Sequence, residues 1–493
     1  MDSIRFKNYR CFSDTGDVKI KPLTFLLGAN SSGKSSFLEF FPLLKQSVGI
    51  RRNGTFLWYS NDVDFKDLGN TIKAGEDSMQ ISWHYDNFVN NPNRMNPKLR
   101  GLSIYKKMFS QVIPLHLTMS ISAQKECFDQ LDMLKLVYLD EEVILEIDSE
   151  GYVNAIVNGR DFKKEKKKLR VFHSTFLLPR IVYFSDNDET DASVPISEHE
   201  ETQEEEYMRL LRELLFSESF MYLEKSDYES YFRELFNRSN IDYELLRDIY
   251  IFLAIEDIID TINYKIQSEA ITLSYVKPLR VMPERYYRYQ NYSVDDIDSD
   301  GKNLAMFLAN LSEAEIKSFQ AWTMKNFNFK IYATKHEGHV ELTIGTSKKE
   351  ARNLVDVGFG YTQLLPIITI IWNALNNKRP RYRYPRVGNA TKIIAIEQPE
   401  LHLHPRLQSA FAEVLAKVIN DLPHSTDLKF IIETHSEAII NKVGALIQKG
   451  DLDTGKVNVV LFNGNNEGLN DYVVESEFDK DGYLSQWPIG FFL

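Results

Sequence analysis

The sequence predicts an α/β fold, in which a mixed sheet with an antiparallel β lobe is interrupted by a helical insertion. Three observations predict this fold. A glycine-rich loop at residues 28–35 stands between an apolar, strand-like run and residues with helical spacing. Apolar and polar residues alternate over much of residues 79–157, which is the period of half-buried strands. Residues 207–266 contain no Gly or Pro, and their large apolar side chains recur at helical spacing.

The composition is that of an ordinary globular protein, long enough for two or three lobes. Of 493 residues, 43% are hydrophobic and 26% are charged, and the net charge of −12 does not favour nucleic-acid binding over the whole surface. The only cysteines, Cys11 and Cys127, suit a reducing compartment. The N-terminus lacks a signal peptide, and the longest apolar run, residues 364–375, is too short to span a bilayer. We therefore expect a cytoplasmic protein without a membrane partner.

The glycine-rich loop matches the phosphate-binding pattern, in which two glycines separated by four residues are followed by Lys and Ser. Backbone N–H groups must point inward around an anion, and glycine lets the chain curl that tightly. Lys34 would contact the β- and γ-phosphates, and Ser35 would hold Mg²⁺. A Gly/Ser-rich turn is the alternative, but the flanking strand and helix favour a nucleoside triphosphate site. The residues predicted to bind the nucleotide here are Asn30, Ser31, Ser32, Gly33, Lys34, Ser35 and Ser36.

Further strands and helices are predicted along the chain. Two short strands around a turn at residues 13–17 precede the loop, and residues 149–151 predict a hairpin turn in the antiparallel sheet. Helices are expected at about 302–325, followed by strands at 329–334 and 339–344.

Two segments rich in cationic side chains have alternative interpretations. The basic run at residues 161–170 is either a solvated loop or a contact for nucleic-acid phosphates. Residues 275–287 are dense in Arg and Tyr. Within them, Arg280 and Arg285 either reach phosphates or stack on tyrosines to hold a loop.

A second polar cluster is predicted where two apolar strands end. Residues 392–396 form a buried strand that is followed by Glu397 and Gln398. A carboxylate in this place beside a phosphate loop binds Mg²⁺, and we assign that role to Glu397, with an acidic turn as the alternative. The strand at residues 430–433 leads to His435, which either hydrogen-bonds the γ-phosphate or is a structural histidine.

A glycine pair opens the longest apolar helix. Backbone N–H groups at a helix start can bind an anion, and Gly358 and Gly360 stand at this start. One chain rarely needs two anion sites for one triphosphate, so this site is predicted to serve a neighbouring subunit. His402 and His404 lack a clear third ligand, and we favour a turn over a metal site there.

These motifs, in this order, resemble the ABC-type P-loop ATPases of the SMC, RecF and OLD group, over residues 1–110 and 270–465. Residues 28–36 match the family's Walker A loop, residues 393–400 match its Walker B strand, and His435 falls at its switch histidine.

Other segments extend this resemblance. Residues 357–363 are similar to the signature motif, although their core is altered, and residues 402–405 follow like the dimer-contact loop. Residues 4–12 look like the adenine-side strand, which places Arg10 near the base. The tail at 478–492 resembles a small C-terminal domain of some stand-alone bacterial ATPases.

The resemblance implies that two chains sandwich two ATP molecules, with Walker A of one subunit facing Gly358 and Gly360 of the other. The sequence departs from the family at Gln398, where the usual residue is the Glu that activates water. An amide orients water but cannot accept its proton, so we predict slow hydrolysis and a long-lived ATP-bound dimer. Glu400 or His435 is the alternative base.

Several ATPases of this group belong to anti-phage defence operons, such as Septu-like systems, and act with a separately encoded nuclease. The resemblance therefore implies a homodimer or higher homo-oligomer that uses ATP and Mg²⁺ to regulate an effector, for which we expect a nuclease. A DNA-repair or chromosome-associated DNA-binding ATPase of the RecF/SMC type is the alternative, and nucleic acid would then be a partner. A metabolic kinase is disfavoured by the switch-histidine and signature-like segments.

Four segments follow from this interpretation. Residues 1–160 are the N-terminal ATPase lobe with the antiparallel sheet, and 161–270 are the helical insertion. Residues 271–465 are the C-terminal ATPase lobe, and 466–493 are the small C-terminal domain.

Overall fold

The computed structural model describes residues 1–89, 112–123, 129–138, 140–162, 169–183, 243–290, 294, 296–376, 391–422, 427–464 and 472–487. The chain divides into two compact units. The first consists of Met1, Gly49–Phe56 and Asp77–Gln267, and the second of Asp2–Val48, Leu57–Glu76 and Ser268–Leu493. These units divide the chain differently from the four predicted segments, whose separate roles stay a prediction.

The second unit is built on a six-stranded sheet with the order β13-β18-β19-β4-β20-β21. Neighbouring strands are parallel, except that β20 and β21 are antiparallel. The four central strands are buried along nearly their whole length, which is typical of a parallel sheet covered on both faces. The strands are β4 (Leu23–Gly28), β13 (Ser274–Val276), β18 (Lys392–Glu397), β19 (Leu428–Glu433), β20 (Val457–Phe462) and β21 (Val473–Ser476).

Two layers of helices cover this sheet. Ile396 and Ile432 are paired in register and belong to the core that α11, α12 and α13 complete. Successive side chains of a strand point to opposite faces, so Glu397 and Glu433 point to the other face, where α1 packs. Both acids therefore lie on the face that carries the phosphate loop. The helices are α1 (Lys34–Leu38), α2 (Phe40–Ser47), α11 (Phe359–Asn376), α12 (Pro405–Asp421) and α13 (Glu437–Gln448).

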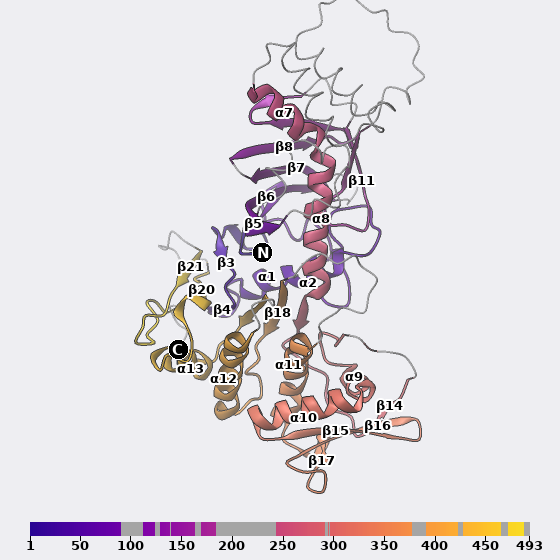
Figure 1. The fold of residues 1–493 in the computed structure, drawn as a ribbon, viewed down its shortest axis with the longest axis vertical. Coiled ribbons are helices and arrows are strands. Elements are labelled where there is room, and N and C mark those ends of the chain that lie inside the picture. Colours follow the sequence, from indigo (N-terminus) through magenta and orange to yellow (C-terminus); the bar gives the residue numbers. More distant parts are fainter. Residues whose placement is uncertain are drawn as a thin grey trace, which may run out of the picture. The chain divides into compact units, whose positions relative to one another are not determined.

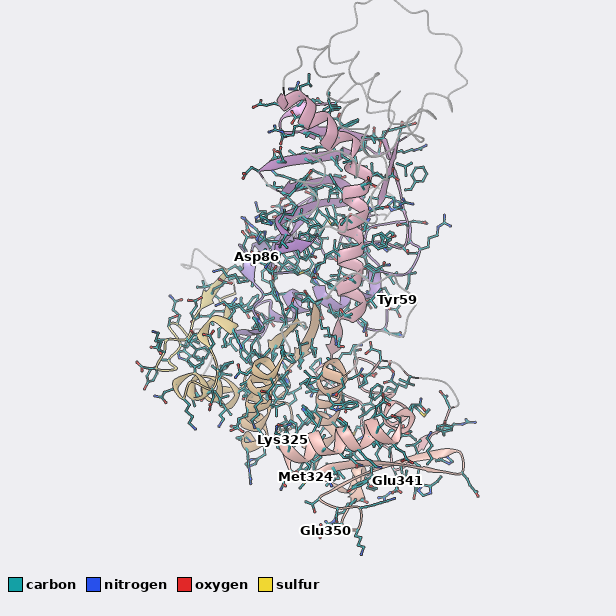
Figure 2. The ribbon with its side chains drawn as sticks, in the orientation of Figure 1. Tyr59, Asp86, Met324, Lys325, Glu341 and Glu350 are labelled. Atoms are coloured by element: carbon teal, nitrogen blue, oxygen red, sulfur yellow. The ribbon has the colours of Figure 1, made fainter. Side chains whose placement is uncertain are left out.

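A group of N-terminal strands and a smaller sheet complete the second unit. At the N-terminus, β1 pairs with both β2 and β3. A four-stranded antiparallel sheet contains β15 and β16, and α10 packs on β15 (Figure 1). Figure 2 labels Met324 and Lys325 on α10 and Glu341 on β16. The elements are β1 (Ser3–Tyr9), β2 (Phe12–Asp14), β3 (Val18–Lys19), β14 (Tyr287–Arg288), α9 (Leu304–Asn310), α10 (Glu313–Phe327), β15 (Lys330–His336), β16 (His339–Gly345) and β17 (Arg352–Asn353).

The first unit contains the predicted antiparallel strands. β5 to β10 pair in chain order, and the burial of their side chains alternates, as in β6. Gly151 has a φ of 83° in the turn between β8 and β9, where a hairpin turn is predicted. The strands are β5 (Ser78–Val89), β6 (Val112–Ala123), β7 (Asp129–Tyr138), β8 (Glu141–Ile147), β9 (Val153–Val157), β10 (Arg160–Asp161), β11 (Leu169–Phe172) and β12 (Arg180–Tyr183).

The predicted helical insertion, residues 161–270, is described at 161–162, 169–183 and 243–270. Its early part is not helical, because β11 and β12 pair there as antiparallel strands. Its last part forms the helices α7 (Tyr243–Leu253) and α8 (Ile255–Thr272). The rest of the predicted helices, at 207–242, and the centre of the basic run, at 163–168, lie outside the described residues. The predicted α/β fold, with its mixed sheet, antiparallel lobe and helical insertion, is confirmed. Among the helices that the structure describes, none has the length and apolar character needed to cross a membrane.

Candidate nucleotide-binding site

The glycine-rich loop connects β4 to α1, and its backbone depends on two glycines. Gly28 has a φ of 154° and Gly33 a φ of 103°. A Cβ atom on Gly28 would lie 2.5 Å from the carbonyl oxygen of Phe462, and one on Gly33 would lie 2.7 Å from Sγ of Cys11. A larger residue would clash with these neighbours at either bend. The tight loop therefore explains why glycine stands at both positions of the sequence pattern.

Lys34 lies inside this loop. The side chain is buried, and its Nζ donates to the carbonyl oxygens of Gly28 at 3.0 Å and Ala29 at 2.6 Å. Burial lowers the pKa of Lys34, while the charges of Glu433 and Glu400 oppose that shift. A cation in this position can contact the phosphates of a nucleotide held by the loop.

The remaining loop residues lie around this lysine. Asn30 and Ser31 are exposed at the tip of the loop, and Ser31 has a φ of 61°. The buried Ser32 hydroxyl has no hydrogen-bond partner among the described residues, which fits a group that binds a phosphate oxygen. The Ser36 carbonyl oxygen accepts a hydrogen bond from the Tyr9 hydroxyl at 3.1 Å, which fixes the start of α1.

Ser35 contacts Glu433, an acid for which the sequence predicts no role. Its hydroxyl donates to the two carboxylate oxygens of Glu433 at 2.9 and 3.1 Å. Glu433 is the last residue of β19, is 2% exposed, and has its pKa raised by burial. A carboxylate directly after an apolar strand run was the available signal, the same signal that singled out Glu397.

Glu397 ends β18 and has a different partner. Its Oε1 accepts a hydrogen bond of 2.6 Å from the Tyr275 hydroxyl. Burial raises the pKa of Glu397 to about 8; the Tyr275 hydrogen bond lowers it, and the charge of Glu433 raises it. Glu397 and Glu433 are register partners on neighbouring strands. The structure thus brings the predicted metal-binding acid next to a second acid, and its metal role stays a prediction.

The turn after β18 is held by one backbone hydrogen bond and by the side chain of Glu400. Gln398 has a φ of 42°, and its N–H donates to the Glu433 carbonyl oxygen at 2.8 Å. Within the described part of the chain, its side-chain amide makes no hydrogen bond. The Glu400 carboxylate accepts from the Thr434 hydroxyl at 2.8 Å and from the His435 N–H at 2.7 Å. Glu400 therefore ties this turn to the loop after β19.

Three histidines lie near these turns. Burial lowers the pKa of His435, and the charge of Lys34 lowers it further, so the ring is neutral at neutral pH. His404 caps α12, because its Nδ1 accepts from the Arg406 N–H at 3.2 Å. The His402 ring packs edge-on against Phe359, with the ring centroids 4.7 Å apart. These contacts agree with turn elements at His402 and His404.

The signature-like glycines differ in their surroundings. A Cβ on Gly360 would lie 2.8 Å from the His402 carbonyl oxygen, so this glycine allows α11 to approach the turn after β18. Gly358 is exposed, and a Cβ there would have no atom within 4 Å. The contact of these glycines with a neighbouring subunit therefore remains a prediction.

Arg10 is held beside the loop by an acid and an aromatic ring. Its φ is 53°, and its Nη2 donates to Glu39 at 3.2 Å. The guanidinium lies over the Phe65 ring, 4.3 Å from its centroid. Cation–π and ionic contacts thus hold the side chain in place, while its role toward the adenine base stays a prediction.

Among the described residues, neither Arg280 nor Arg285 stacks on a tyrosine ring, and their contact with phosphates stays a prediction. Nη2 of Arg280 donates to the carbonyl oxygens of Glu397 at 2.9 Å and Gln398 at 3.4 Å. Arg285 forms a bidentate ion pair with Asp356, with distances of 2.6 and 3.1 Å. Carbonyl and carboxylate oxygens, rather than tyrosine rings, hold both arginines.

The oxygen atoms at this sheet edge fit Mg²⁺. Ser35, Glu433 and Glu397 offer a hydroxyl and two carboxylates, which are the hard ligands that Mg²⁺ prefers. The described residues contain no group of three or more His, Cys, Asp or Glu side chains that could hold a metal ion. Phosphate oxygens and water would therefore complete the coordination, as is usual for Mg²⁺ bound with a nucleotide.

Comparisons with known proteins indicate the family of the chain. The family described as "AAA ATPase domain" matches residues 1–440. Endonuclease GajA from Bacillus cereus (strain HuB5-5) is 30% identical over 88 residues, which are 17% of this chain and 12% of that protein. The chain thus aligns with only a small part of that curated relative.

Solved structures of two kinds are also similar. The Smc head domain of Pyrococcus furiosus, bound to the C-terminal domain of ScpA, is 12% identical, with a TM-score of 0.37 and coverage of 96% of this chain and 95% of that chain. The recombination mediator protein RecF with ATP is 13% identical, with a TM-score of 0.26 and coverage of 89% and 94%.

Proposed function

The chain belongs to the AAA ATPase domain family, and we propose that it is an ATP-dependent switch that closes as a dimer around two ATP molecules. One observation carries this proposal. Lys34, Ser35 and Glu433 meet beside a phosphate loop, at the carboxyl ends of β4 and β19. This edge of a parallel sheet is where nucleotides bind in open α/β folds.

In this proposal each part of the site has one task. The loop and Lys34 hold the phosphates, and Ser35 with Glu397 and Glu433 would hold Mg²⁺, which stabilises charge on the phosphates when bound. Water attacks the γ-phosphorus, the bond to the bridging oxygen breaks, and the proton of the water ends on the released phosphate. Gln398 orients the water but does not take its proton, so hydrolysis is slow.

The surroundings of Gly358 support the dimeric part of the proposal. The start of α11 presents backbone N–H groups to an anion, and the exposed Gly358 leaves room for one. We propose that this helix start contacts the ATP held by the partner subunit, so that ATP joins two chains.

The switch would regulate a separate effector. We propose that this effector is a nuclease in bacterial anti-phage defence. The stretch similar to Endonuclease GajA supports the proposal, although it covers 17% of this chain. The resemblance to stand-alone defence ATPases points the same way.

A pull-down tests the function. The tagged full-length chain is purified with Mg²⁺ and ATP from its native host, and bound protein and nucleic acid are identified by mass spectrometry and sequencing. Recovery of a nuclease, lost with Lys34→Ala, is the expected result. Recovery of DNA without a nuclease would favour the DNA-repair alternative, and no ATP-dependent partner would contradict both.

A further inference from the structure

Arg280 carries a buried charge that has no assigned task in binding the nucleotide. The residue is 5% exposed, and its Nε and Nη1 have no hydrogen-bond partner within the described ranges. Burial lowers the pKa of Arg280 to about 10, and the charges of Glu400 and Glu397 oppose this shift. A buried arginine with unpaired N–H groups is unfavourable for stability, so a role in function is the better explanation.

The third nitrogen shows what this arginine holds. Nη2 lies between the carbonyl oxygens of two successive residues, Glu397 and Gln398. Gln398 has a φ of 42°, a left-handed conformation that residues other than glycine adopt at a cost in free energy. The surrounding contacts must therefore maintain this conformation, and it determines the direction in which the Gln398 side chain leaves the backbone.

A second contact links Arg280 to α11. The Gln363 amide donates to the Arg280 carbonyl oxygen at 3.5 Å, and Gln363 is buried in the first turns of that helix. The backbone of Arg280 thus contacts α11, the helix that begins directly after Gly358, while its side chain contacts the turn after β18.

We propose that Arg280 is a positioning residue for ATP hydrolysis, which holds the backbone at Glu397 and Gln398 so that the Gln398 amide faces the attacking water. This role rests on the proposed function, in which Gln398 orients that water. A lysine would not replace the arginine, because an ammonium is a compact point charge on a flexible stem and lacks the planar guanidinium.

A double-mutant cycle tests this role. The variants are Arg280→Lys, Gln398→Ala and both together, with Arg288→Lys as an exposed arginine control on β14. Phosphate release gives kcat and KM for ATP. We expect Arg280→Lys to lower kcat about tenfold with KM changed less than about twofold, and to have little further effect once Gln398 is alanine. Arg288→Lys should match wild type.

Several outcomes overturn the role of Arg280. Equal losses of kcat from Arg280→Lys in both backgrounds would show that Arg280 acts independently of Gln398. An unchanged kcat in Arg280→Lys would show that no such positioning exists. If Gln398→Ala leaves kcat unchanged, the proposed role of Gln398 fails, and the role of Arg280 fails with it.

Folding of the variants is checked separately. Thermal unfolding and binding of a fluorescent ADP are measured for each of them. Should Arg280→Lys fail to fold, Arg280→Gln takes its place in the same cycle, because its amide keeps a donor for the Gln398 carbonyl without a buried charge. The same coupling to Gln398 is expected for that variant, and independent losses would overturn the role.

Discussion

Gln398, Glu397, Glu433 and Glu400 are four neighbouring residues whose side chains have different environments. Glu433 accepts a hydrogen bond from the Ser35 hydroxyl, and Glu397 accepts one from the Tyr275 hydroxyl. Glu400 accepts two hydrogen bonds from the loop after β19. Of these four side chains, that of Gln398 alone makes no hydrogen bond to another described residue. Its side chain is therefore the one of the four that can reorganise around a water molecule at little cost.

Replacing this amide by a carboxylate should increase turnover. A glutamate at 398 can accept the proton of the attacking water, so we expect Gln398→Glu to raise kcat by about 10- to 100-fold, measured as steady-state phosphate release. Gln448→Glu adds the same charge on the exposed end of α13 and should have no effect. Rapid wild-type turnover that Gln398→Glu leaves unchanged would contradict slow hydrolysis.

The raised pKa of Glu397 predicts how stability depends on pH. Its pKa is about 8 in the folded chain, against a model-peptide value of 4.5, so the folded state binds this proton more tightly. Without nucleotide or Mg²⁺, the contribution of Glu397 to the free energy of unfolding is fully present below about pH 4.5 and is lost as the pH rises through about 8.

Glu397→Gln removes this dependence. The thermal midpoint of the variant should fall less than that of wild type between about pH 5 and 8, as differential scanning fluorimetry would measure. Glu337→Gln, at an exposed position, is the control and should follow wild type. Parallel curves for wild type and Glu397→Gln would show that this carboxyl does not hold its proton in the folded chain.

At the scale of elements, the two glycines at the start of α11 have different surroundings. Gly360 packs against the turn after β18, whereas Gly358 faces open space. Gly360 therefore packs the helix against its own chain, whereas the space beside Gly358 leaves room for an anion at the helix start. This division matches the proposed contact with the ATP of a partner subunit.

A negative charge at this helix start should prevent dimer closure. We expect Gly358→Asp to abolish ATP-dependent dimerisation through repulsion of the partner's phosphates, while nucleotide binding by the monomer changes little. Light scattering and fluorescent ADP binding separate the two effects. Ser347→Asp, in an exposed loop, adds the same charge as a control. Normal dimerisation of Gly358→Asp would place the interface elsewhere.

For the whole molecule, the nucleotide site lies within the second compact unit. That unit gathers residues from both ends of the chain, since β4 is flanked by β19 and β20. The first unit, with β5 to β10, α7 and most of α8, contributes none of the site residues described above. We propose that partner-specific regulation resides there.

ATP should change the mass of the assembly. We expect the wild-type chain to at least double its mass in solution with Mg²⁺ and ATP, and Lys34→Ala to stay at the mass of the nucleotide-free chain, measured by multi-angle light scattering. The reason is that Lys34 supplies the only side-chain charge inside the phosphate loop. Lys348→Ala, at an exposed position, should behave as wild type. An unchanged wild-type mass would contradict closure around ATP.

Local features of the site could be predicted from the sequence because they depend on neighbouring residues. The spacing of Gly28, Gly33 and Lys34 encodes a tight loop, since only glycine tolerates the close contacts and positive φ there. Alternation and apolar runs predicted the strands in the same way, because side chains of a strand point to alternate faces. ATPase family membership follows from such motifs.

The partners of the site residues were decided by the tertiary structure. Ser35 and Glu433 are 398 positions apart, and they meet because β19, rather than β18, lies next to β4. Strand order depends on how the whole chain packs, and no local pattern records it. For the same reason the sequence alone could not place Arg280 on the carbonyl oxygens of Glu397 and Gln398.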